Sequence, residues 1–375
     1  MSIRLPPSAA HIWGAPDGCT GWVQMCDRVE DLGSKDASSE GSRVGALATA
    51  ILKDPAHKFD STLYTQEMLD AVAMYVDDVN RVMAENPQGV VGFEEHVKIK
   101  DVHDECEGSI DAYLYSPQTK VLHIWDFKYG HRVVDEYRNI QLLLYFFGLQ
   151  HKSHYSIWSK APIDVVMTIV QPRAFAPGGP IRSWRVNSEE LRSLLPVINA
   201  NAHTALSPRA TTRSGTHCRD CHTRHACKTA LDAGMSLYEL AQLPVPQQLA
   251  PEALGVQLSI IKRAAEQLKF LETGYRAQVE SLASLGTNIP GWGMKHTVGA
   301  KAWTGPMEDA LQIGDLLDID IRKPLAVITP TQAIKAGLPL ELVDSMSARP
   351  STGTKLIEED MTGLQQVFRQ ENNHG

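Results

Sequence analysis

The sequence predicts an α/β fold, in which helices flank a central mixed sheet. Two short, strongly apolar segments, 121–127 and 165–170, have the length and composition of strands buried inside a sheet. Apolar residues recur at helical spacing over 64–85 and 135–150. Because helical and extended segments alternate along the chain, we expect the helices to pack on the sheet rather than form a separate bundle.

The N-terminal part predicts helical additions to this sheet. Residues 1–60 hold Pro, Gly and Ser between short helical segments, and 41–52 predict a helix of small and apolar residues. The helix over 64–85 is amphipathic, since Met68, Val72 and Val79 recur on one side. Both helices precede the first strand.

The central part predicts the sheet itself. Ser-Pro-Gln-Thr at 116–119 is a turn signal between two extended segments, which it joins into a hairpin. We expect strands over 89–99, 109–115, 121–127 and 165–170, with the helix over 135–150 before the last of them.

The C-terminal part predicts helices and a small accessory region. A helix is expected over 187–205, a linker over 244–251, and the longest helix over 252–285, which ends before Gly286. The sequence therefore divides into a main domain at 1–235, a helical segment at 236–290 and an α+β accessory region at 291–375.

Composition excludes several classes of protein. The 375 residues carry a net charge of −8, whereas a protein that simply coats nucleic acid is usually basic. A run of about eighteen apolar residues, which a membrane helix needs, is absent, and the N-terminus lacks the apolar stretch of a signal peptide. We therefore expect a cytoplasmic protein with reduced cysteines and no membrane partner.

Carboxylates and a lysine gather around the predicted hairpin. Asp111 lies on one strand, and Asp126 and Lys128 lie at the end of the next. Residues two apart on a strand project from the same face, and the hairpin can bring the two aspartates together. Carboxylates that hold Mg²⁺ or Mn²⁺ beside a cationic side chain suit phosphodiester hydrolysis. Glu94 on the first strand would assist, and Glu95 competes with it because strand alternation admits only one of them.

The helix that follows adds two polar residues on one face. Gln141 and Tyr145 are four residues apart, so they lie on the same side of the helix. That side would meet the end of the hairpin, where the pair could contact a phosphate or position Lys128. A packed tyrosine with an exposed glutamine is the alternative.

Three cysteines predict a second, separate metal site. Cys218, Cys221 and Cys227 are spaced C-x2-C-x5-C, which favours a metal over disulfides in a reducing compartment. Either zinc or an iron–sulfur cluster suits thiolate ligands. Cys26 and Cys106 have no matching spacing and are expected to be ordinary thiols.

Together these motifs resemble the RecB-type branch of the PD-(D/E)XK nucleases. The shared residues are Gly-Ser-Ile-Asp at 108–111, Asp-Phe-Lys-Tyr-Gly at 126–130 and Gln-Leu-Leu-Leu-Tyr at 141–145. The resemblance implies a restriction-endonuclease-like core with Asp111, Asp126 and Glu94 as ligands of Mg²⁺ or Mn²⁺. It also implies Lys128 as the catalytic lysine, with Gln141 and Tyr145 completing the catalytic motif.

A closer resemblance is to phage- and prophage-associated proteins of this nuclease type. Ser8, His11 and Trp13 match the N-terminal Ser-x-x-His-x-Trp stretch of that group, and a cysteine, Cys19, follows. The chain departs from the pattern at one place, because Gly45 stands where many relatives have a histidine. A missing histidine could weaken or alter metal binding.

The same resemblance extends to the cysteines. The C-x2-C-x5-C run is similar to the end of the iron–sulfur staple in the AddB subunit, in which the first cysteine lies far upstream. Cys19 fits that position, so the resemblance implies a structural 4Fe–4S cluster on Cys19, Cys218, Cys221 and Cys227. The alternative is zinc on Cys218 and Cys221 with one of the histidines 217, 222 or 225, which leaves Cys19 free.

The expected function is metal-dependent exonuclease activity at linear DNA ends, on double or single strands, in phage or prophage recombination within a bacterial host. A single-strand annealing or single-strand-binding protein is the expected partner, and unwinding would come from elsewhere because the sequence lacks a G-x4-G-K-[ST] motif. The alternatives are a DNA-binding or scaffold protein with reduced catalysis, and a zinc-dependent regulatory protein. Trp292, Lys295, Lys301 and Trp303 could form a strand-binding surface or an ordinary core with surface lysines.

Overall fold

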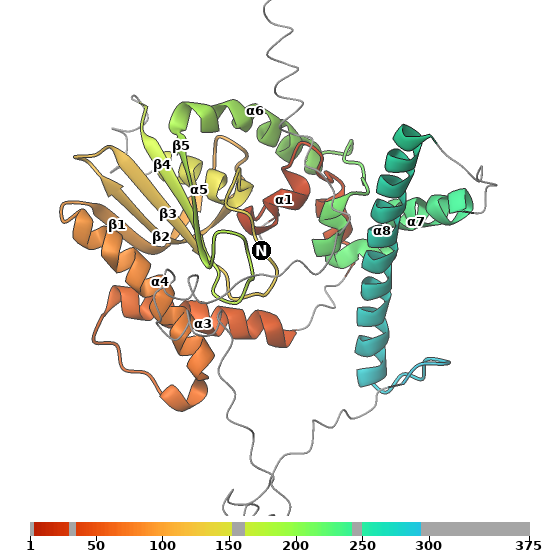
Figure 1. Ribbon diagram of the computed structural model, residues 1–375, viewed down its shortest axis with the longest axis horizontal. Helices are drawn as coiled ribbons and strands as arrows, with labels where there is room; N and C mark the ends of the chain where they lie inside the picture. The colour runs from red at the N-terminus through yellow and green to blue at the C-terminus, as the bar shows by residue number, and fades with distance from the viewer. Residues whose placement is uncertain (1–3, 30–34, 152–161, 242–249, 294–375) are drawn as a thin grey trace, which may run out of the picture. The chain divides into compact units, whose positions relative to one another are not determined.

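The computed structural model describes residues 4–29, 35–151, 162–241 and 250–293. They belong to one compact unit that spans Met1–Lys295 (Figure 1). Of the accessory region expected at 291–375, all but the first three residues lie outside the described residues. The hypothesis about Lys295, Lys301 and Trp303 lies outside them as well.

A five-stranded mixed sheet forms the centre of the unit, as the α/β prediction requires. Neighbouring strands follow the order β1-β2-β3-β4-β5, and every pair is antiparallel except β3 with β4, which is parallel. The sequence did not predict β5. The strands are β1 (Val90–Lys98), β2 (Glu107–Ser116), β3 (Val121–Phe127), β4 (Asp164–Val170) and β5 (Ile181–Asn187).

One face of the sheet is covered by α5 (Ile140–Gln150), α6 (Ser188–Ala205) and the N-terminal helices α1 (Ala10–Trp13) and α2 (Trp22–Cys26) (Figure 1). The helix predicted from residue 135 starts later, at 140. Asn139 caps it by accepting a hydrogen bond from the Leu142 N–H at 3.2 Å, which fixes the first turn.

The other face is covered by α3 (Lys35–Lys53) and α4 (Gln66–Glu85). Thr65 caps α4, and the apolar side of that helix packs on β2 and β3. Trp125 of β3 is buried under it and donates its indole N–H to Asp78 of α4 at 2.9 Å. With both faces covered, the end of β3 is the place where the sheet can present polar groups to a ligand.

The cysteine run lies in two short 3₁₀ helices, Thr216–Asp220 and His222–Ala226, followed by α7 (Lys228–Ala241) and α8 (Pro251–Ser284). The sequence analysis separated the helical segment 236–290 from the main domain at 1–235. Instead, Gln267 of α8 donates to the Gly215 carbonyl at 2.7 Å, and Arg224 donates to the Phe270 carbonyl at 2.8 Å. The helix therefore belongs to the same unit as the cysteines.

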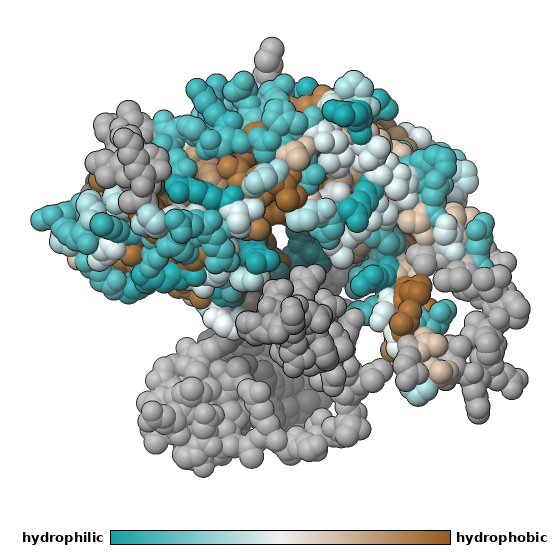
Figure 2. All heavy atoms as spheres, turned by 90° about the horizontal axis from the view of Figure 1, so that it is seen from above, coloured by the Kyte–Doolittle hydropathy of each residue, from teal (hydrophilic) through white to brown (hydrophobic). Residues whose placement is uncertain are grey.

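Figure 2 shows hydrophilic side chains over much of the face that it presents, with apolar residues in patches between them. Within the described residues, no helix is both long and apolar enough to cross a membrane.

Candidate active site

The β2–β3 hairpin brings the two predicted aspartates together. Ala112 pairs with Trp125, so the neighbouring residues Asp111 and Asp126 stand side by side across the two strands. The Phe127 N–H donates to Oδ2 of Asp111 at 2.7 Å. Asp126 is the penultimate residue of β3, and Asp111 lies inside β2.

Lys128, Gln141 and Tyr145 join Asp126 in one hydrogen-bonded network. The Lys128 ammonium lies 3.0 Å from Oδ2 of Asp126 and donates to the Gln141 side-chain carbonyl at 3.2 Å. The Gln141 amide donates to Oδ1 of Asp126 at 2.8 Å and to the Tyr145 hydroxyl at 3.1 Å. The structure thus joins two motifs that lie on a strand end and on the following helix, and the alternative of an exposed glutamine does not hold.

Glu94 rather than Glu95 faces the aspartates. Phe93 pairs with Ala112 and Glu95 with Ile110, so Glu94 stands opposite Asp111. Its φ of 50° lies in the left-handed region, which is uncommon for residues other than glycine and often marks a functional position. The Glu95 carboxylate instead accepts the Tyr113 hydroxyl at 2.6 Å.

The charges gathered at this site shift the pKa values of Asp111 and Lys128. Burial, reinforced by the charge of Asp126, raises the pKa of Asp111 to about 7. Burial favours the neutral form of Lys128, but the carboxylates of Asp126 and Asp111 outweigh it and raise the lysine pKa above its ordinary value. Lys128 therefore stays cationic, and a cation bound beside Asp111 would lower the pKa of that carboxyl further than Lys128 does, because it favours the ionised form.

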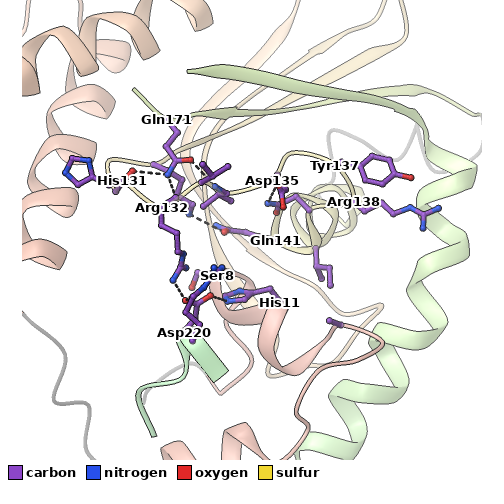
Figure 3. Close-up of a pocket in the computed structure, with 18 residues that line it drawn as sticks. Ser8, His11, His131, Arg132, Asp135, Tyr137, Arg138, Gln141, Gln171 and Asp220 are labelled. Carbon is purple, nitrogen blue, oxygen red and sulfur yellow. Dashed lines mark hydrogen bonds and ion pairs between the residues drawn. The ribbon is translucent and has the colours of Figure 1, made fainter. Parts of the chain in front are cut away.

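A basic pocket opens on one side of this network (Figure 3). Lys128 and Gln141 form part of its wall, and the loop 130–139 forms another part. Three arginines line the pocket: Arg132, Arg138 and Arg219. The N-terminal segment contributes the predicted motif residues Ser8 and His11. A cavity with this lining suits a phosphate-bearing ligand.

Two residues that the sequence analysis missed hold the loop of the basic pocket. Gln171 follows β4 directly, donates to the carbonyls of Gly130 at 2.9 Å and Arg132 at 2.5 Å, and accepts the Val134 N–H at 3.0 Å. Arg182 of β5 is 5% exposed and donates to Gln171 and to the Val134 carbonyl. A polar residue directly after a buried parallel strand is a signal that could have identified Gln171.

Asp220 connects the basic pocket to the cysteine run. It lies between Cys218 and Cys221 and pairs with Arg132 of the loop. On its other side, the His11 imidazole lies 3.1 Å from the same carboxylate. Asp220 therefore ties three distant parts of the chain together at the wall of the basic pocket, as Figure 3 shows.

A second pocket, here called the α3 pocket, opens on the other side of the aspartates. Glu94, Asp111 and Phe127 line it from the sheet, and Tyr75 lines it from α4. Its remaining wall is one face of α3, which carries mostly small residues, Gly41, Ser42, Gly45, Ala46, Thr49 and Ala50, followed by Lys53. Gly45 thus belongs to the wall that faces Glu94 and Asp111.

The four predicted cysteines gather around one small cavity. Cys19, Cys218, Cys221 and Cys227 all line it, and Cys19 and Cys218 are buried. The Arg213 N–H donates to the Cys19 sulfur at 3.3 Å, and the Gly215 N–H donates to the Cys218 sulfur at 3.4 Å. Burial opposes ionisation of Cys218, but the His217 imidazole and the Gly215 N–H outweigh it and lower the thiol pKa.

Hydrogen bonds dock the N-terminal segment beside these cysteines. The Gly21 N–H donates to the Thr211 carbonyl at 2.9 Å, and Gln24 donates to the Ser207 carbonyl at 2.8 Å. Trp13 is fully buried in the core of the unit. The segment around Cys19 and the segment around Cys218 are therefore neighbours in the fold, although about 200 residues separate them.

The residue types at the two sites fit the expected metals. Oδ2 of Asp126 is buried and, among the described residues, contacts the Lys128 ammonium at 3.0 Å without a well-oriented hydrogen bond, so it keeps lone pairs for a hard cation that prefers oxygen. Four cysteines around one cavity suit an iron–sulfur cluster or zinc. As the side chains lie, the described residues contain no group of three or more His, Cys, Asp or Glu that could hold a metal ion, so the fit is one of donor type and location.

Comparison with known protein families places the chain in one family. The family described as "Protein of unknown function (DUF2800)" matches residues 3–315, which is most of the chain, and the protein belongs to it. A comparison with curated proteins found no match. The family match covers the carboxylate network, both pockets and the cysteine cavity.

Proposed function

We propose that the protein is a Mg²⁺- or Mn²⁺-dependent DNA exonuclease of the RecB-type PD-(D/E)XK class. The observation that carries the proposal is the network Asp126–Lys128–Gln141–Tyr145 beside Asp111. A buried carboxylate pair with a cationic lysine at the edge of a basic pocket is what hydrolysis of a phosphodiester needs.

Asp111, Asp126 and Glu94 would hold the divalent cation. When bound, the cation supplies a Lewis acid that polarises the phosphate and lowers the pKa of a water ligand. Lys128 is 28% exposed, so its ammonium can reach a ligand in the basic pocket and stabilise negative charge that develops on the phosphate. Gln141 holds Asp126 and Lys128 in place, and the buried Tyr145 hydroxyl fixes Gln141.

The four cysteines would hold a 4Fe–4S cluster with a structural role, and zinc is the alternative. Joining Cys19 to the cysteine run removes conformational freedom from the unfolded chain over a very long loop. The cluster would also fix Asp220, which lies between two of its ligands and pairs with Arg132.

Linear DNA would be the substrate, in phage or prophage recombination in the cytoplasm of a bacterial host. A phage single-strand annealing or single-strand-binding protein would be the partner.

End-labelled linear duplex and single strands, incubated with Mg²⁺ or Mn²⁺ beside a circular control, test the proposal. We expect cleavage products from linear DNA, none from circular DNA, and loss of activity in Lys128→Ala. Lys98→Ala is the matched control, because Lys98 lies on β1 with a 60% exposed side chain away from the network.

Wild-type protein that binds DNA and does not cleave it with either metal contradicts the proposal. That result would favour the alternative of a DNA-binding or scaffold protein, for which Gly45 in place of a histidine is the motivating observation. Equal activity of Lys128→Ala and wild type would remove the catalytic assignment of the network.

A further inference from the structure

The α3 pocket has a lining that packing alone does not explain. Gly41 and Gly45 lie inside a helix, where glycine is less favourable than any residue except proline. A Cβ added at either position would meet no atom within 4 Å, so neighbouring groups do not require glycine there. The two glycines have ordinary helical backbone, so no unusual φ requires them either. What they do provide is open space in front of the carboxylates.

A buried tyrosine gives independent evidence for a ligand in this space. Tyr75 is 1% exposed, and its hydroxyl makes no hydrogen bond with the part of the chain that the structure describes. Its ring stacks on Phe127 with centroids 4.9 Å apart, which fixes where the hydroxyl lies. Buried hydroxyls are rarely left without a partner, because the lost hydrogen bonds to water are not replaced. A ligand in the α3 pocket would supply that partner.

The charges around the pocket indicate what the ligand is. Glu94 and Asp111 would hold a divalent cation, and a cation between two carboxylates and a ligand favours an anionic ligand such as a phosphate. Lys53, at the far end of the same helix face, adds a positive charge. The face of α3 that carries Gly41 and Gly45 has no large side chains, so a sugar-phosphate backbone can approach the helix closely. Glycine commonly occupies positions where the protein backbone approaches a ligand.

The size and position of the pocket narrow the ligand further. The cavity volume is about 630 Å³, a size that holds a ligand of one or two nucleotides and not a duplex. Phe127 lines the α3 pocket and the next residue, Lys128, lines the basic pocket, so the two pockets flank the same strand end. A polynucleotide that crosses the aspartates would occupy both.

We propose that the α3 pocket holds a single, unpaired strand of nucleic acid, with its backbone against Gly41 and Gly45 and a phosphate oxygen at the Tyr75 hydroxyl. This inference rests on the proposed function and adds to it that the strand is unpaired where it meets the cation. Duplex ends would then have to fray or be opened before cleavage.

The test measures binding of a fluorescent eight-residue oligothymidylate by anisotropy in Ca²⁺, which accepts the same oxygen ligands as Mg²⁺. Gly45→Leu fills the pocket, and we expect it to raise the Kd at least about tenfold, a steric effect worth the loss of several close contacts. Gly255→Leu on α8 is the matched control, since Gly255 is also helical with open space around it, and its Kd should equal that of wild type.

Tyr75→Phe separates ligand binding from folding. Because the hydroxyl has no partner among the described residues, its removal should leave the melting temperature unchanged or raise it. The Kd should nevertheless rise about fivefold, the size of one lost hydrogen bond. A purely structural tyrosine would show no such change in Kd.

Three results overturn the inference: wild type that does not bind the oligonucleotide, Gly45→Leu that binds like wild type, or a blunt duplex that binds as tightly as the single strand. Cleavage of the same oligonucleotide in Mg²⁺ by wild type is measured in parallel. If wild type cleaves the oligonucleotide and both variants bind it with the wild-type Kd, only the role of the α3 pocket is overturned. If wild type binds the oligonucleotide and does not cleave it, the proposed exonuclease activity is overturned and the role of the α3 pocket in binding stands.

Discussion

The carboxylate network and the cysteine cavity are built in opposite ways. The network takes its residues from β2, β3 and α5, so 35 residues of chain, Asp111 to Tyr145, contain all of it except Glu94. The cysteine cavity takes Cys19 from the N-terminal segment and its other members from 218–227. A site made from neighbouring core elements is preformed by the fold, whereas a site made from distant segments acts as a tie between them.

The carboxylate network and the cysteine cavity also differ in how accessible they are to a ligand. Lys128 and Glu94 of the first site are open to the two pockets, so a cation and a substrate can come and go. The cysteine cavity is small, and two of its four thiols are buried. Under the proposed function, chemistry belongs to the first site and stability to the second, and the following predictions test that division.

The largest expected effect is on the rate of cleavage. Asp126→Asn keeps the shape of the side chain and removes its charge, so a cation loses a ligand and Lys128 loses its partner. We expect DNA cleavage to fall at least about 100-fold, as when one preorganised electrostatic group is removed. Initial rates on end-labelled DNA measure this. A melting temperature within a few degrees of wild type is the control, and a collapse of the fold would contradict the division.

The second effect is on stability. Cys218→Ser should abolish the brown colour and visible absorption of an anaerobic preparation and reduce the free energy of unfolding by about 2–5 kcal/mol, similar to loss of a native crosslink. Denaturant unfolding measures it, with Cys26→Ser as the matched control. Colourless wild-type protein that contains zinc would replace the iron–sulfur assignment, and unchanged stability of Cys218→Ser would contradict the role as a tie.

The third effect is on the pH dependence of cation binding. Because the pKa of Asp111 is raised to about 7, its carboxyl is mostly protonated below that pH, and a cation must displace the proton. Affinity for Mg²⁺ should therefore rise with pH, by about tenfold from pH 6 to pH 8. Calorimetric titration at several pH values measures this, and proton uptake rather than release on binding would contradict it.

The smallest effect is on the residue that joins the two regions. Asp220→Asn removes the charge that Arg132 and His11 face, while leaving all four cysteines in place. We expect the KM for DNA to change about fivefold, the effect of a partly exposed ion pair, with kcat nearly unchanged. Asp27→Asn is the control, because Asp27 pairs with Arg4 away from the pockets. A loss of kcat equal to that of Asp126→Asn would mean that the two regions are not separable.

Local patterns in the sequence were enough to predict most of the sheet. The strand expected over 121–127 has those bounds in the structure, because its apolar run ends at a charged residue and begins after a turn. β5 escaped prediction since Arg182 and Arg185 interrupt its apolar pattern. Only the tertiary contacts show that Arg182 is buried by pairing with Glu136 and Gln171.

The candidate site divides in the same way. Residue spacing pointed to Asp111, Asp126 and Lys128, because strand periodicity decides which neighbours share a face, and the resemblance to RecB-type nucleases added roles for Gln141 and Tyr145. The choice of Glu94 over Glu95 depended on a left-handed backbone at residue 94, which breaks the alternation that the sequence pattern assumes. The partners Gln171, Arg182 and Asp220 come from chain segments whose proximity the local sequence does not encode.

The sequence by itself determined the α/β class, the residues of the carboxylate network and the run Cys218, Cys221 and Cys227, because each follows from short-range spacing, whereas Cys19 was added only through the resemblance to the AddB cysteine staple. Only the tertiary structure decided that Cys19 lies beside the cysteine run, that Asp220 meets Arg132, and that the face of α3 around Gly45 opens onto Glu94 and Asp111. Those contacts join residues far apart in the chain, and they form only when burial of the two apolar faces of the sheet brings the helices together.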